Sequence, residues 1–210
     1  MGLTARDTRT SAAAAAGAIL GACAELVSRL TQEQYAAPCA RMYGASVGKH
    51  VRHVLDHFRA VIRAAPAPGR LGAGARQHGR EEAPCEEIEY DNRTRAVPEE
   101  TDRGVALRAI TEVRAALDAL RGAVGMDERE VRVRVLLSDN GEEGVFRSTL
   151  GRELAFASHH ALHHHAMIGV IANELGQPPA DGFGMAPSTL RHARELAVGG
   201  TGGRSSERDA

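Results

Sequence analysis

Histidines are concentrated in two short stretches of the chain. The segment KHVRHVLDHF contains His50, His53 and His57, and the segment ASHHALHHHAMIG contains five more. These five are His159, His160, His163, His164 and His165. Imidazole is the commonest metal ligand in proteins, whereas histidine is an indifferent helix former. Two such concentrations in one chain therefore favour metal binding over an ordinary helix surface.

The spacing within each segment points to the same chemistry. His160 and His164 are four residues apart, as are His53 and His57, and residues with this spacing share one face of a helix. Ligands donated from facing helices are usual in bundle interiors, and three histidines plus water form the open type of zinc site. Nickel, copper and iron(II) also accept imidazole. A second ion bound through His50 or His57 is an open alternative.

Other side chains near these segments have expected supporting roles. Asp56 and Glu153 are candidates for orienting the metal-bound rings, because Glu153 lies two turns before His160 on the same face. We expect His159, His163 and His165 to face other sides of their helix, toward solvent, an interface or the surroundings of the site.

Hydrophobic periodicity predicts four helices and one hairpin. The helices cover 10–33, 46–65 (with Ser46 as N-cap), 101–124 and 149–175. EVRVRVLLSDNGEEGVFRST, residues 130–149, alternates and then turns, which is typical of two short strands. CEEIEYD, residues 85–91, is expected to be a short extended piece.

The expected fold is therefore all-α: a four-helix bundle with a long crossover connection and a small β-hairpin between helices three and four. We assign 1–197 to one domain and expect 198–210, VGGTGGRSSERDA, to be a disordered tail.

Composition limits the class of protein. The chain is 43% hydrophobic but only 3% aromatic, which predicts an aliphatic core. A net charge of -1 argues against nucleic acid or an anionic membrane as a partner. Three cysteines without a Cys-x-x-Cys pair fit a reducing cytoplasm better than a disulfide framework. The N-terminal SAAAAAGAILGACA favours an amphipathic helix over a cleaved leader, and no run is expected to span a bilayer.

The two histidine segments also resemble a known family. SVGKHVRHVLDHF followed by HHALHHHAMIGVI is similar to the DinB/YfiT-like metalloenzyme superfamily over about residues 10–176. In that family a histidine follows a Ser or Thr by seven residues, which here is His53 after Ser46, and a His-x-x-x-His pair follows in helix four. The resemblance implies a metal bound by His53, His160 and His164. Many members have His-Arg-Gly-Gln where this chain has HHAM, so the substrate does not follow from the family.

The segment YDNRTR resembles a subgroup motif between helices two and three. Asp91 offers an acid or base, and Arg93 and Arg95 offer an anion clamp for a cofactor or substrate. The alternative is a loop held by a local salt bridge. Asp56 and His57 are the other candidates for moving protons.

These observations predict a metal-dependent enzyme with a three-histidine site. The ion is zinc by preference, with nickel or iron as alternatives, and it would activate water or a thiol for a hydrolase-type or thiol-dependent transferase reaction. The resemblance suggests a low-molecular-weight thiol as cofactor. The expected partner is a small-molecule substrate, and a homodimer is compatible with this. The alternatives are a non-catalytic metal-binding or stress-response protein and a plain helical dimerisation module.

Overall fold

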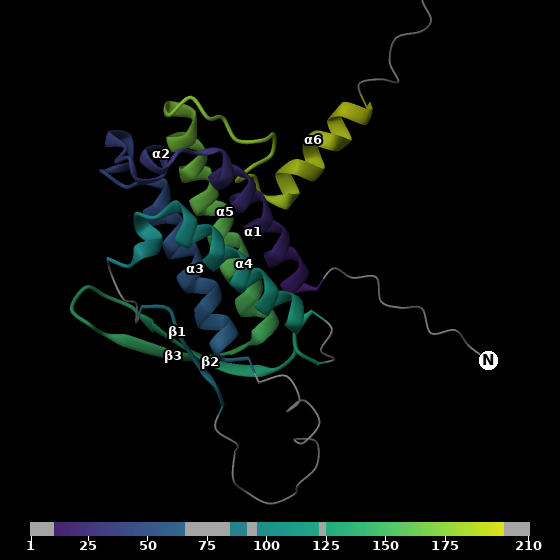
Figure 1. Ribbon diagram of the computed structural model, residues 1–210. Coiled ribbons are helices and arrows are strands. Elements are labelled where there is room, and N and C mark those ends of the chain that lie inside the picture. The colour runs from purple at the N-terminus through teal and green to yellow at the C-terminus, as the bar shows by residue number, and fades with distance from the viewer. Residues whose placement is uncertain (1–10, 66–84, 92–95, 122–124, 200–210) are drawn as a thin grey trace, which may run out of the picture.

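The protein is mostly helical, with a small three-stranded sheet (Figure 1). The computed structural model describes residues 11–65, 85–91, 96–121 and 125–199. Its helices are α1 (Ala12–Arg29), α2 (Gln32–Ala36), α3 (Val47–Arg63), α4 (Arg103–Leu120), α5 (Leu150–Glu174) and α6 (Pro187–Gly199), with short 3-10 turns η1 (Ala40–Met42) and η2 (Pro98–Glu100). Its strands are β1 (Glu87–Glu89), β2 (Glu130–Leu136) and β3 (Glu143–Thr149).

The four long helices pack on one another around a shared core. Both α1 and α3 contact α4 and α5. The core side chains are largely aliphatic, as the composition predicted; among the fully buried ones are Leu20, Leu26, Leu55, Ile110, Leu117, Leu154 and Ile168. This packing fixes α3 against α5, and these two helices carry the two histidine segments.

Polar side chains define where three of these helices begin. The Ser46 hydroxyl accepts a hydrogen bond from the Lys49 N–H at 3.2 Å, so the predicted N-cap of α3 is confirmed. Asp102 caps α4 and Thr149 caps α5 in the same way. Such caps satisfy backbone donors that have no partner within the first helical turn.

The prediction of one helix over 10–33 is wrong in one respect, because the structure has two helices in this region. α1 ends at Arg29, and Leu30 is extended. Thr31 then starts α2 with a reciprocal pair of bonds: its hydroxyl accepts from Gln34 N–H, and the Gln34 side chain accepts from Thr31 N–H. This capping box stabilises a new helix start, which outweighs continuation of α1.

By length and composition alone, α1 is apolar enough to cross a membrane, contrary to the expectation that no run would be. Core helices of soluble proteins pass the same test. Here Leu20, Cys23 and Val27 of α1 are buried in the core formed with α4 and α5.

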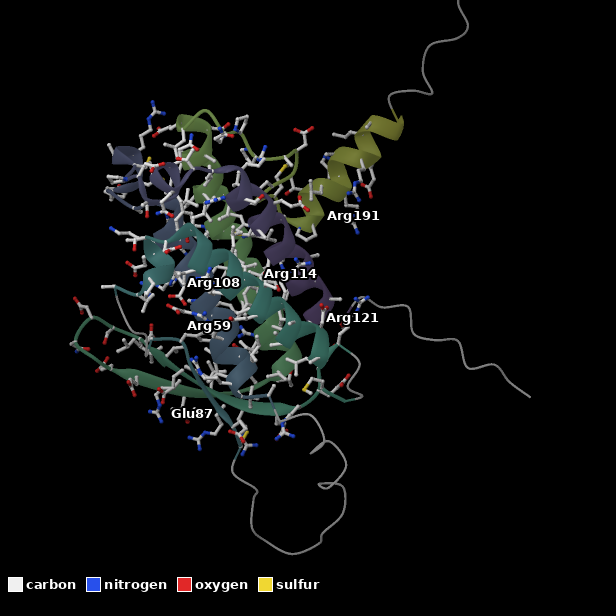
Figure 2. The ribbon with its side chains drawn as sticks, viewed as in Figure 1. Arg59, Glu87, Arg108, Arg114, Arg121 and Arg191 are labelled. Atoms are coloured by element: carbon white, nitrogen blue, oxygen red, sulfur yellow. The ribbon has the colours of Figure 1, made fainter. Side chains whose placement is uncertain are left out.

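The predicted hairpin at 130–149 is confirmed. β2 and β3 pair antiparallel, with Val133 opposite Phe146. The short extended piece becomes β1, which pairs parallel to β2 and places Ile88 opposite Val133. Ile88, Val131 and Val133 are buried on one face of the sheet. Figure 2 shows Glu87 on the other side, away from the helices, where its carboxylate binds Arg134 at 2.7 Å.

Helix α6 was not among the predicted helices. It projects away from the four long helices (Figure 1), and its residues 191–197 are exposed. It extends to Gly199, two residues into the segment expected to be a tail. Residues 200–210 of that segment lie outside the described part of the chain.

Candidate metal centre

Histidines from α3 and α5 meet where these helices pack together. His53, His57 and His160 each present a ring nitrogen, and the three nitrogens all lie within 4.8 Å of one another. His57 is buried, and the other two are partly exposed. The packing of α3 on α5 thus brings together side chains separated by about a hundred residues of sequence.

His53 and His160 are in close contact within the cluster. Their Nε2 atoms are 2.8 Å apart, and their ring centroids are 4.9 Å apart. Without a cation between them, only one of two facing neutral nitrogens can donate to the other. The Nε2 atoms of these two rings therefore point at a common position.

His57 is held in one tautomer by the backbone. Its Nδ1 lies 3.1 Å from the carbonyl oxygen of His53, one helical turn earlier. A carbonyl oxygen only accepts, so Nδ1 carries the proton and donates. Nε2 is then unprotonated when the ring is neutral, which is the usual arrangement of a metal-binding histidine. The ring is also sandwiched between Tyr90 and His160, whose centroids lie 5.0 and 4.1 Å away.

His164, which the family resemblance implied as a ligand, borders this group. Its ring centroid is 4.5 Å from that of His53 and 4.6 Å from that of His160. Its Nδ1 faces Nδ1 of His50 at 2.9 Å. The three nitrogens that converge most closely thus include His57, which the sequence suggested as a proton-moving residue, in place of His164.

Burial keeps the neighbouring imidazoles neutral. Desolvation, followed by repulsion from nearby rings of which His160 is the largest contributor, lowers the pKa of His164 to about 3. Desolvation, and then His163, lower the pKa of His50. Both rings are neutral at physiological pH and therefore do not repel a cation in this region.

The residues fit a divalent cation. Two histidine nitrogens bound to one tetrahedral zinc lie about 3.3 Å apart, given zinc–nitrogen bonds of about 2.0 Å. The His53–His160 pair at 2.8 Å needs to open by only about half an ångström. Three uncharged nitrogen donors suit zinc, nickel, copper or iron(II) rather than magnesium or calcium, which prefer oxygen.

A buried carboxylate supports the cluster through Tyr90. Glu153 is fully buried, and its two oxygens accept hydrogen bonds from the Tyr90 hydroxyl at 2.7 Å and the Ser148 hydroxyl at 2.6 Å. Arg152 adds an ion pair at 2.6 Å. The sequence suggested that Glu153 orients a histidine ring; instead, it fixes Tyr90, and Tyr90 stacks on His57. In the sequence, Tyr90 is the first residue of the YDNRTR motif, and nothing in that motif indicates a contact with a histidine.

The other predicted catalytic and binding residues occupy different positions. Asp56 forms an ion pair with Arg52 at 2.6 Å. Asp91 accepts a hydrogen bond from the Leu136 N–H at 2.9 Å and lines a cavity of about 400 Å³ at the sheet, together with Arg134. Asp91 is thus tied to β2. Arg93 and Arg95 lie outside the described residues.

The remaining histidines of α5 separate into two groups. His159 and His163 are exposed. His165 is only 1% exposed, so of the three expected surroundings, solvent is excluded for this residue. Its ring stacks on Phe183 with centroids 4.6 Å apart, and burial lowers its pKa to about 4. The loop after α5 folds back onto the helix at this point, and no periodicity within α5 indicates that.

Comparison with known families agrees with this geometry. A profile of the DinB superfamily matches residues 20–168, which include both histidine segments. The chain belongs to the DinB superfamily. DinB proteins generally bind metal ions, in keeping with the cluster of His53, His57 and His160.

One curated relative also resembles this DinB protein. FK506-binding protein 5 of Rhizopus delemar is 34% identical over 108 residues, which cover 51% of this chain and 28% of the relative. The match spans little more than a quarter of that protein's length. No solved structure matches the chain significantly.

Proposed function

We propose that this DinB protein binds one catalytic divalent metal ion through His53, His57 and His160. The observation that carries the proposal is the convergence of three histidine nitrogens within 4.8 Å of one another, two of them on α3 and one on α5. Zinc is the preferred ion for three neutral imidazoles, with nickel or iron(II) as alternatives.

The choice of His57 as third ligand rests on its tautomer. Because its Nδ1 donates to the His53 carbonyl, the neutral ring has an unprotonated Nε2, which is the form that can coordinate an ion. In this assignment His164 adjoins the site and is oriented by His50, which faces it at 2.9 Å. The family resemblance favours His164 as ligand, so single substitutions of His57 and His164 distinguish the two assignments.

Three protein ligands leave a coordination position for a small molecule. A divalent ion here supplies Lewis acidity, which lowers the pKa of a coordinated water or thiol toward neutrality. The chain's own contribution is to hold the rings: the His53 carbonyl and Tyr90 fix His57, and buried Glu153 fixes Tyr90. The proposed activity is a transferase that uses a low-molecular-weight thiol, or a hydrolase, acting on a small molecule.

Two further parts of the proposal concern the setting of the site. The packing of α1, α3, α4 and α5 supports a DinB-type four-helix bundle with a crossover between α3 and α4. A cytoplasmic location is supported by three free cysteines, two of them buried.

Cobalt substitution tests the catalytic proposal against a purely metal-binding role. The d–d spectrum of cobalt-loaded, untagged protein should change on addition of a small thiol, because a three-histidine site has an open position. His159→Ala, an exposed change on the same helix, should respond identically. A spectrum indifferent to thiols and to other small anions would instead support a closed, non-catalytic metal-binding protein.

A further inference from the structure

The outer edge of β3 has the features of a pairing surface. β3 is seven residues long and lies at the end of the sheet order β1-β2-β3. Among the described residues, no strand pairs with its outer side. A long edge strand with accessible backbone groups is a template for another strand unless it is blocked by proline, a bulge or a covering element.

The register of the hairpin determines which backbone groups are available. The Leu137 N–H donates to the Glu142 carbonyl at 2.7 Å, just before β3 begins. Bonded and non-bonded pairs alternate along an antiparallel ladder. It follows that Glu143, Val145 and Arg147 direct their N–H and C=O groups away from β2, toward the free edge.

One positive charge on this edge, that of Arg147, has no described acidic partner. Arg147 stands directly opposite Arg132 on β2, and like charges in that position are destabilising. Arg132 has Glu87 at 3.7 Å, whereas Arg147 forms no ion pair with any residue that the structure describes. Glu143 lies four residues before Arg147 on the same face of β3 and contacts Arg134.

We propose that two copies of this chain pair antiparallel through β3, about a two-fold axis at Val145. This register places Glu143 of each copy opposite the partner's Arg147, twice by symmetry, and aligns the outward backbone groups of all three edge residues. A two-fold at Glu143 or at Arg147 instead places identical charges opposite each other. Of these three positions for the axis, only Val145 gives Arg147 of each copy an opposite charge as its partner.

Apolar exposure supports the same pairing. Val145 is 38% exposed and Phe146 is 52% exposed. In the proposed register each Val145 meets its own copy, and each Phe146 lies beside glycine on the neighbouring strand, since the residue before Val145 is Gly144. Both side chains become less accessible to water on pairing, and the three-stranded sheets join into one of six strands.

The test is a charge swap followed by light scattering of the full chain over a micromolar concentration series. The wild type should dimerise, Arg147→Glu should weaken dimerisation roughly 10- to 100-fold by making both symmetric pairs repulsive, and the double change Glu143→Arg with Arg147→Glu should restore it. Circular dichroism verifies that each variant is folded. A monomeric wild type, or a dimer unaffected by Arg147→Glu, would overturn the proposal.

A crosslinking experiment tests the register itself. In a Cys85→Ser background, Val145→Cys should form a disulfide-linked dimer under mild oxidation, because directly opposite residues have Cα atoms about 5.5 Å apart. Glu142→Cys, three residues from the proposed axis, should not crosslink. Equal crosslinking of both variants, or crosslinking of Glu142→Cys alone, would contradict the proposed axis.

Discussion

The Nε2 atoms of His53 and His160 lie 2.8 Å apart, although 107 residues separate them in the sequence. The contact exists because α3 packs on α5 within the helical core. It makes these two residues the fixed pair of the proposed metal centre, and the third ligand depends on which neighbouring ring has a nitrogen directed at them.

His57→Ala and His164→Ala separate the two possible third ligands. With His57 as ligand, His57→Ala should lower zinc affinity by at least about 100-fold, whereas His164→Ala should lower it no more than about tenfold, as expected for a neighbouring residue. Competition titration with a chromophoric chelator measures both. The reverse order of effects would assign the third position to His164.

Tyr90→Phe tests the link between the buried carboxylate and the cluster. Removing the hydroxyl leaves one Glu153 oxygen without its 2.7 Å donor, so the free energy of unfolding should fall by about 1–3 kcal/mol. The aromatic ring still stacks on His57, so zinc affinity should change much less than in His57→Ala. Urea unfolding of the metal-free protein measures the change in the free energy of unfolding. Unchanged stability would show that the hydrogen bond has no energetic role.

Acid should destabilise the metal-free protein through His165. Burial lowers its folded pKa to about 4, whereas an unfolded histidine titrates near its ordinary value of about 6.5. The unfolded state therefore binds the extra proton first, and stability present above about pH 6.5 is lost as the pH falls toward 4. The difference amounts to about 3 kcal/mol.

Urea unfolding at several pH values, with chelator present, measures this slope. His165→Gln should unfold with a shallower pH dependence than the wild type. His164, whose pKa is also lowered, contributes in the same direction in both proteins. Identical slopes would show that His165 titrates normally in the folded state.

Gly48→Ala tests how closely η2 packs on α3. A Cβ at this position would lie 2.1 Å from the Glu100 carbonyl oxygen and 2.8 Å from the Tyr35 ring. Alanine normally stabilises a helix over glycine by about 1 kcal/mol, but here the clash should destabilise by about 1–3 kcal/mol. Gly17→Ala, on α1 with nothing within 4 Å of the new Cβ, should show the ordinary stabilisation. Thermal unfolding of both variants shows whether their changes in stability have opposite signs.

Local patterns predicted much of this architecture. Capping chemistry and periodicity act within a few residues. They predicted the N-cap at Ser46, the hairpin at 130–149 and the helices α3, α4 and α5. The break at Thr31 does not follow from periodicity, because the apolar stripe runs without interruption up to Leu30; the capping box at Thr31 is the local signal that opposes a continuous helix.

The site was predictable to the level of its helices but not of each ring. Spacing places His53 and His57 on one face, so it does not say which of them meets His160. That depends on the angle at which α3 crosses α5 and on the backbone bond that fixes the His57 tautomer. Likewise, Asp91 was expected at the site, but the sheet register ties it to Leu136 instead. Such tertiary relationships have no periodic trace in the sequence.

The most direct test of the metal centre is the metal content of protein purified without a tag or a chelating resin. The wild type and His159→Ala should each retain about one equivalent of a divalent transition metal, because His159 is exposed and is not one of the proposed ligands. His53→Ala combined with His160→Ala should lose it while remaining helical by circular dichroism. A metal-free wild type that takes up no zinc, nickel or iron on titration would contradict the account, and so would a double variant that binds metal as the wild type does.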